Sequence, residues 1–175
     1  HAKAHAVLID FTTSSPALAK KLYTAAKAKG YAMLDAPVSG GDSGAKAASL
    51  SIMTGGDEEV FEQMLPLFSL LGTGIQYMGE AGSGQHTKAC NQIAVAGAVA
   101  AMSEALVYAR AVGLDEQKML TAIAKGAAGS WQIDNTAPRV LANDFATGLY
   151  IKHCIKDMHI VQQEREQQDV QRDMQ

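Results

Sequence analysis

The sequence predicts an α/β unit followed by an all-helical unit, and three observations support this. Short apolar runs alternate with helical segments over residues 6–79, which is the pattern of strands and helices in a layered sheet. From residue 83 to residue 112 no turn signal interrupts the chain, so one long helix is expected there. Every later segment has helical patterning. The two domains are expected to span residues 1–81 and 82–175.

Turn residues separate strands from helices in the first unit. The apolar runs that predict strands are residues 6–10, 31–37, 49–56 and 74–79, with helices expected over 15–30 and 57–72 and a glycine-rich loop over 38–47. Ser15 is a typical helix N-cap with Pro16 in the first helical position. Pro66 is expected to kink or divide the second helix. The first strand, helix and strand form a βα unit with parallel strands.

The second unit begins with the long helix, which Gly113 is expected to end. At 1.5 Å per residue this helix would be about 45 Å long, enough to cross from one domain into another. Further helices are expected over residues 115–126, 130–141 and 148–164, with Asp115 as a cap and a break near Pro138. The polar tail, residues 162–175, either extends the last helix or frays.

Composition excludes several functional classes. The chain has 175 residues and a net charge of -3, and its lysines are scattered, so no nucleic-acid partner is expected. Cys90 and Cys154 lie far apart, which favours free thiols in the cytoplasm over a disulfide framework. The uncharged run 89–103 is shorter than the roughly 20 apolar residues of a membrane span, so no membrane partner is expected.

Two patterns resemble known binding motifs but lack the residues that bind the ligand. Residues 79–86 imitate a phosphate-binding loop, but Gln85 stands where that loop needs lysine and His86 where it needs serine or threonine. Without the cation and the magnesium-binding hydroxyl, the loop loses its mechanism. The pairs His86–Cys90 and His153–His159 have no carboxylates at a recognisable spacing, so no metal site is expected.

Polar residues open the long, otherwise apolar helix. Lys88, Asn91 and Gln92 are spaced to share one helix face. A lysine near a helix N-terminus opposes the helix dipole, so it does not serve helix stability. Partial burial would lower the pKa of its amine, which suits acid–base catalysis. The alternative is a lysine whose stem lies along the surface with its ammonium in water.

A second candidate is the run Ser39, Gly40 and Gly41, which follows the strand that Pro37 ends. Glycines let the backbone approach a ligand closely, and consecutive N–H groups with one hydroxyl can bind an anion. The alternative is an ordinary surface turn. Composition alone slightly favours that turn.

Together these pieces resemble the β-hydroxyacid dehydrogenase family, which includes 3-hydroxyisobutyrate dehydrogenase and tartronate semialdehyde reductase. "DAPVSGG" (35–41) matches the substrate-loop motif of the family, and "GSGQHTKACNQ" (82–92) resembles its G-x-G-x-x-x-K-x-x-N catalytic motif. "LIDFTTSSP" (8–16) and "IKDM" (155–158) resemble two further elements. The four motifs occur in the family's order over residues 6–161.

The resemblance implies a role for each matching position. Lys88 would be the catalytic acid–base, and Asn91 would hydrogen-bond the substrate. The other implied site residues are Ser39, Gly40 and Gly41 for the substrate carboxylate, Thr13 and Lys156 for the cofactor, and Trp131 for a pocket wall. The cofactor would be NAD or NADP.

The chain departs from the family at three places. Gln92 replaces the second asparagine of the common pair, and the polar tail differs from the family's further apolar helices. The resemblance also implies an upstream half of the dinucleotide-binding domain, with a glycine fingerprint that this sequence lacks. The expected fold is therefore the C-terminal part of a Rossmann-like domain joined by the long helix to a helical domain, and this part alone is expected to be inactive.

The function expected from the resemblance is NAD(P)-dependent oxidoreduction of small 3-hydroxy acids, of the 3-hydroxyisobutyrate or 2-hydroxy-3-oxopropionate type. A lysine general acid–base would accompany hydride transfer. The protein is expected to be a homo-oligomer, with the Ala- and Gly-rich helix permitting a dimer. The alternative is a non-catalytic fragment that serves association or substrate binding only.

Overall fold

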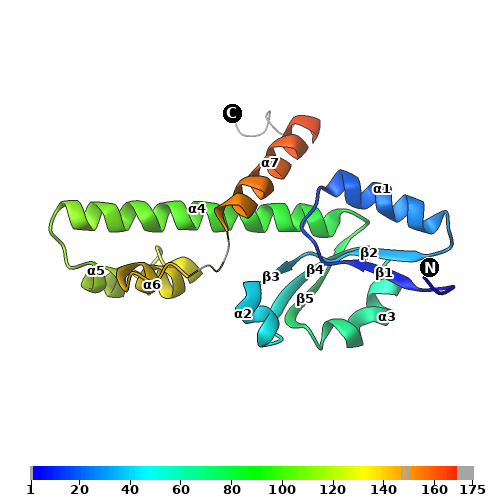
Figure 1. The fold of residues 1–175 in the computed structure, drawn as a ribbon, viewed down its shortest axis with the longest axis horizontal. Helices are drawn as coiled ribbons and strands as arrows, with labels where there is room; N and C mark the ends of the chain where they lie inside the picture. The colour runs from blue at the N-terminus through cyan, green and yellow to red at the C-terminus, as the bar shows by residue number, and fades with distance from the viewer. Residues whose placement is uncertain (1, 147, 149, 169–175) are drawn as a thin grey trace. The chain divides into compact units, whose positions relative to one another are not determined.

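The computed structural model describes residues 2–146, 148 and 150–168 (Figure 1). An α/β part comes first, and one long helix leads from it into further helices, as the sequence predicts. The last helix extends into the polar tail as far as Gln168, and the rest of that tail lies outside the described residues.

The sheet is mixed, whereas the sequence indicated only its parallel βα unit. Its strands are β1 (Val7–Asp10), β2 (Ala32–Asp35), β3 (Val38–Ser39), β4 (Leu50–Gly56) and β5 (Gly72–Gly79). The pairs β1–β2 and β4–β5 are parallel, while β2 and β3 both run antiparallel to β4. Pro37 separates β2 from β3, and its carbonyl accepts a hydrogen bond from Met53 N. The short strands therefore follow one edge of β4 on either side of the proline.

The segment expected to be a glycine-rich loop instead forms β3 and the short helix α2 (Gly41–Lys46). Gly40 and Gly41 have φ of 131° and 63°, values that side chains disfavour. The glycines thus make a sharp reversal between a strand and a helix.

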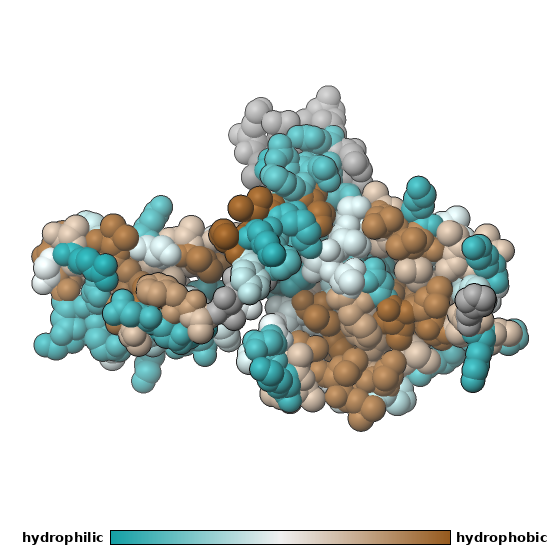
Figure 2. Space-filling view, in the orientation of Figure 1, coloured by the Kyte–Doolittle hydropathy of each residue, from teal (hydrophilic) through white to brown (hydrophobic). Residues whose placement is uncertain are grey.

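Helices α1 (Pro16–Lys27) and α3 (Glu58–Phe68) lie on opposite faces of the sheet (Figure 1). The Ser15 side chain accepts from Leu18 N, which confirms the predicted cap. Pro66 does not divide α3, which continues through it to Phe68. The core of this layer contains Leu34, Ile52 and Phe68, all fully buried. Apolar side chains also gather on the surface where α3 lies (Figure 2).

Five helical segments follow: α4 (Ser83–Ala111), α5 (Glu116–Ile123), the π-helical turn η1 (Gln132–Thr136), α6 (Ala137–Leu141) and α7 (Ile151–Gln168). The π turn stands directly before Pro138, where the sequence predicted a break. Asp115 caps α5 by accepting from Lys118 N at 2.9 Å.

The chain forms two compact units that divide inside α4. The sheet unit contains residues 1–92 together with α7, and the helical unit contains residues 93–147. The core of the helical unit includes Met102, Leu106 and Leu120. The expected domain limit at residues 81 and 82 coincides with the end of the sheet and the start of α4, and that division into domains stays a proposal.

Length and composition alone would allow α4 to cross a membrane, with a mean hydropathy of 1.4 over an 18-residue window. The run 89–103 was too short by itself, but the whole helix is longer. Core helices of soluble proteins meet the same criterion, so this is weak evidence for a span. The first turns of α4 also bury the polar side chains of Gln85, Lys88 and Gln92.

Gly84 lets α4 approach the sheet closely. A Cβ atom built there would lie 2.4 Å from Met53 O and 2.8 Å from Asp35 O. Both obstacles are backbone atoms, which cannot move aside as a side chain can. Gly97 on the same helix has nothing within 4 Å of an added Cβ.

Replacing Gly84 by alanine should therefore destabilise the full-length protein by roughly 1–3 kcal/mol, the usual cost of overpacking. Gly97→Ala is the matched control and should be neutral or stabilising by up to about 1 kcal/mol, because alanine favours helix. Urea unfolding of both variants measures the difference. Equal effects of the two substitutions would contradict the close packing of α4 on the sheet.

Candidate active site at the start of α4

The buried carboxylate of Asp35 fixes the start of α4. Asp35 ends β2 and is only 3% exposed. Its Oδ1 accepts from Gly82 N at 2.7 Å and its Oδ2 from Gln85 N at 3.0 Å. The first N–H groups of a helix lack partners within the helix, and the helix dipole favours a negative charge there. Asp35 therefore determines where the first turns of α4 lie relative to the sheet.

Gln85 joins this helix start to the segment that follows β1. Its side chain is almost fully buried, with Oε1 accepting from Ser14 N at 3.1 Å and Nε2 donating to Thr12 O at 2.8 Å. In the sequence, Gln85 was notable only because it replaces the lysine that a phosphate-binding loop needs. In the structure it holds the segment 12–14 against α4.

Lys88 lies one turn beyond Gln85 and is 7% exposed. Burial lowers the pKa of its amine from the ordinary 10.5, because a low dielectric disfavours the ammonium form. Two charges also act on it: the Asp157 carboxylate raises the pKa of Lys88, and the Lys156 ammonium lowers it. The buried side chain excludes the alternative of an ammonium lying free on the surface.

Asp157 connects α7 to the same face of α4, and sequence reasoning did not identify it. It is 6% exposed, and its Oδ2 accepts from Gln92 Nε2 at 2.5 Å. Its Oδ1 lies 2.8 Å from Lys156 Nζ. Asn91 is half-buried and donates to Gln92 Oε1 at 2.8 Å. The "IKDM" motif contained this residue, but only its lysine was considered.

Thr13 and Lys156, the two predicted cofactor residues, are in direct contact. Lys156 Nζ donates to Thr13 O at 2.8 Å, across 143 positions of sequence. The segment 12–14 is thus tied to α4 through Gln85 and to α7 through Lys156. These contacts bring Lys88, Thr13 and Lys156 into one cluster.

One buried oxygen of this cluster, Ser14 Oγ, has neither a hydrogen-bond nor an ion-pair partner, whereas Asp157 Oδ1 is paired with the Lys156 ammonium. Thr54 Oγ1, which is also without a partner, belongs to β4 in the sheet. Buried polar atoms in native proteins are nearly always hydrogen-bonded. The Ser14 hydroxyl beside Thr13 therefore offers donor and acceptor capacity to a bound polar group.

The carboxylate-binding candidates lie where β3 turns into α2. Ser39 is half-buried and pairs with Ser51 of β4, while Gly40 and Gly41 are exposed. Among the hydrogen bonds and ion pairs of the described residues, none joins Ser39, Gly40 or Gly41 to Lys88. Their predicted role stays a proposal.

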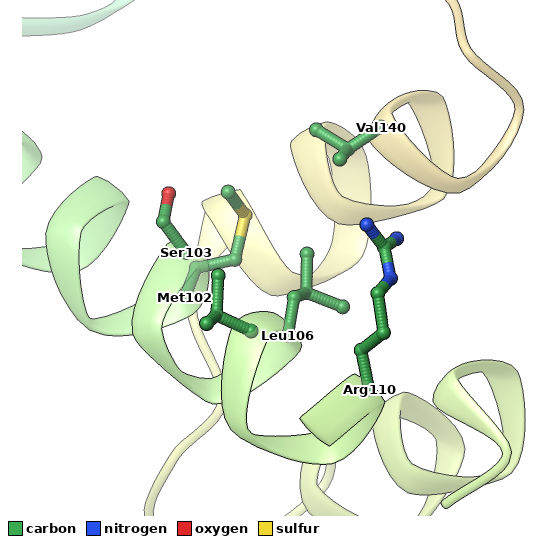
Figure 3. A pocket seen from close by; sticks show the side chains of 6 residues that line it. Met102, Ser103, Leu106, Arg110 and Val140 are labelled. Atoms are coloured by element: carbon green, nitrogen blue, oxygen red, sulfur yellow. The ribbon is translucent and has the colours of Figure 1, made fainter. Parts of the chain in front are cut away.

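Trp131 belongs to the helical unit and is 63% exposed. That unit has a hollow of about 150 Å³ between α4 and α6 (Figure 3). Apolar side chains, Ser103 and Arg110 line it, and Arg110 Nε donates to Glu116 Oε1 at 2.7 Å. A second hollow of about 410 Å³ opens beside Tyr23 and Asp57 in the sheet unit. Neither contains a predicted site residue, and the role of Trp131 stays a proposal.

Within the described ranges, no group of three or more His, Cys, Asp or Glu side chains could hold a metal ion. The cluster does fit one end of a dinucleotide. It follows the carboxyl ends of the parallel strands β1 and β2, where α/β sheets bind such ligands. The unpaired Ser14 hydroxyl and the nearby Lys156 ammonium are suitable partners for a polar aromatic amide. The phosphate groups of the dinucleotide would have to be bound by residues outside this cluster.

In comparisons with known proteins, both parts of the chain match family models described as NAD-binding. Residues 82–174 match the model of the NAD-binding domain of NADP-dependent 3-hydroxyisobutyrate dehydrogenase. Residues 1–79 match the model of the NAD-binding domain of 6-phosphogluconate dehydrogenase.

Two curated relatives and one solved structure extend this result. An uncharacterized oxidoreductase of Bacillus subtilis is 55% identical over 95% of the chain. A probable 3-hydroxyisobutyrate dehydrogenase-like mitochondrial protein of Arabidopsis thaliana is 48% identical over 88%. The chain spans 58% and 46% of their lengths.

The solved structure is Mycobacterium tuberculosis 3-hydroxyisobutyrate dehydrogenase with L-serine. It aligns with a TM-score of 0.87 and 31% identity, covering 96% of this chain and 60% of that one. The fold is therefore that of a Rossmann-type domain joined to a helical domain. Because a family model matches more than half of the sequence, the chain belongs to the β-hydroxyacid dehydrogenase family.

Proposed function

We propose that the protein is an NAD(P)-dependent oxidoreductase of small 3-hydroxy acids in which Lys88 is the general acid–base. One observation carries the proposal: a buried lysine of lowered pKa lies at the point where α4, α7 and the segment after β1 meet. Structural lysines are rarely buried, because an ammonium is costly to remove from water. A functional site is the simplest reason to retain one.

The chemistry follows from the neutral amine. When substrate is oxidised, Lys88 Nζ takes the hydroxyl proton while the carbon loses hydride; when the carbonyl is reduced, the ammonium returns that proton to the oxygen. A bound NAD(P) supplies the hydride acceptor or donor. A lowered pKa increases the neutral fraction near pH 7 and thus the fraction of Lys88 able to act as base. Asp157 limits the shift, so the ammonium needed for reduction is still available.

Substrate binding is assigned to the turn of Ser39, Gly40 and Gly41, with Asn91 as a hydrogen-bond partner, Trp131 as a pocket wall and Lys156 as a cation near the cofactor. A carboxylate suits the N–H groups of the turn, and a hydroxyl on the third carbon would leave room to reach Lys88. L-serine, present in the related mycobacterial structure, is a compound of this kind. The proposed substrates are acids of the 3-hydroxyisobutyrate or the 2-hydroxy-3-oxopropionate type.

We also propose how the protein assembles and where it is located. Several apolar side chains of α4 are exposed, including Ile93, Val107 and Tyr108, which supports a homo-oligomer such as a dimer. Cys90 and Cys154 are both free thiols, which suits the reducing cytoplasm.

Replacing Lys88 by methionine in the full-length protein should lower kcat by roughly 10²–10⁴-fold, the usual contribution of general acid–base catalysis. Methionine keeps an unbranched apolar stem, so folding and cofactor affinity should be preserved. Lys29→Met removes an exposed lysine and is the matched control. Steady-state rates with a panel of hydroxy acids provide the measurement. If Lys88→Met kept wild-type kcat, the non-catalytic alternative would be favoured.

Substituting valine for Gly41 should raise the KM for the hydroxy acid by at least about tenfold, because the side chain would occupy the approach of the carboxylate. Gly30→Val controls for backbone strain, since both glycines have positive φ, 63° and 76°, and open space around an added Cβ. Both variants should lose similar stability, but only Gly41→Val should change KM. A comparable KM increase in both variants would remove the turn from the binding site.

A further inference from the structure

We infer that Gln85 is a positioning residue that holds the backbone of Thr12–Ser14 in place for the nicotinamide end of the cofactor. The inference rests on the proposed function in one respect, namely that this segment faces the cofactor. It goes beyond that function because Gln85 itself touches neither substrate nor hydride. Its role would be to preorganise the backbone of the site before the cofactor binds.

The contacts of Gln85 are specific to an amide. One end of the side chain accepts from Ser14 N and the other donates to Thr12 O, so both polar atoms are used on the two residues flanking Thr13. The side chain is 1% exposed, and buried hydrogen bonds of this kind are costly to leave unmade. A carboxylate of the same shape could accept from Ser14 N but could not donate to Thr12 O.

The helix end that carries Gln85 is itself fixed. The Gln85 backbone N–H is held by Asp35, a carboxylate buried in the sheet. On the other side of the segment, Lys156 donates to Thr13 O. Thr13 therefore lies between two residues that are hydrogen-bonded to Gln85, and its own carbonyl accepts from Lys156 of α7. A short segment fixed from the sheet, from α4 and from α7 has little freedom to lose when a ligand binds, which favours affinity.

Binding of NAD+ and NADP+ to the full-length protein, measured by calorimetry, tests the inference. Gln85→Leu should weaken binding of the preferred cofactor by roughly tenfold or more at every pH, since two buried hydrogen bonds are lost. Gln85→Glu should weaken it strongly at pH 8 and less at pH 5.5, because the protonated carboxyl regains a donor for Thr12 O. Gln63→Glu, exposed on α3, should bind like wild type.

The charged groups around this position are Asp10, Asp35, Lys88, Lys156 and Asp157. Each variant is compared with the wild type at the same pH. A purely structural role would lower stability without this pH-dependent recovery of affinity. Wild-type affinity in both Gln85 variants would overturn the inference, as would an equal loss at both pH values for Gln85→Glu.

Hydrogen exchange at the Ser14 amide gives a second readout that needs no cofactor. Exchange should be faster in Gln85→Leu, which has no acceptor for this N–H, and close to wild type in Gln85→Glu. Unchanged protection in Gln85→Leu would contradict the contact itself. If wild type bound no cofactor or Lys88→Met kept full activity, the proposed function would fail, while the exchange result would still decide whether Gln85 holds the segment. Should Gln85→Leu fail to fold, Gln85→Glu carries the test alone.

Discussion

The hydrogen bonds from Gly82 N and Gln85 N to the Asp35 carboxylate are the interaction on which the site depends. They fix the first turn of α4 to the end of β2. A helix advances about 100° and 1.5 Å per residue, so fixing residues 82 and 85 also determines where Lys88 and Gln92 point. Gly84 makes this approach possible, since any side chain there would meet the backbone of β2 and β4. The glycines of the motif and its lysine are thus parts of one geometric arrangement.

The site holds a buried ammonium near a buried carboxylate without a direct ion pair between them. Desolvation lowers the pKa of Lys88 and the Asp157 charge raises it, so the two effects oppose each other. Asp157 is in turn held by Gln92 and lies against Lys156. An amine that both gains and loses a proton during turnover needs such a balance, because a fully stabilised ammonium is a poor base. Gln92 replaces the second asparagine of the common pair, and it is the residue that donates to the Asp157 carboxylate.

Sequence reasoning was most successful where local chemistry decides the structure. The caps at Ser15 and Asp115 and the uninterrupted helix from Ser83 are confirmed. Of the two effects expected of Pro66, division of α3 does not occur. The loop expected over residues 38–47 was wrong, because β3 and α2 form there instead. The antiparallel pairing of β2 and β3 with β4 is a tertiary property that no local pattern encodes.

The same distinction applies to the site. Burial of Lys88 was one of two alternatives that the sequence left open, because its spacing to Asn91 and Gln92 shows a shared helix face but not what covers that face. Asp157 and Gln85 were missed, because their partners lie 65 and 73 positions away in the sequence. Periodicity reports which residues share a helix face, but not which distant carbonyl or carboxylate meets that face. The four ordered motifs supplied the family, and the structure supplied the network among them.

The most direct test of the account is the titration of Lys88 itself, followed by NMR of ¹³Cε-labelled lysine and assigned by comparison with Lys88→Arg. The midpoint of Lys88 is expected below 10.5, because burial disfavours its ammonium. In Asp157→Asn the midpoint should fall further, because the carboxylate that stabilises the ammonium is removed. A Lys88 midpoint at or above 10.5 that does not respond to Asp157→Asn would contradict the assignment of a buried acid–base at the start of α4.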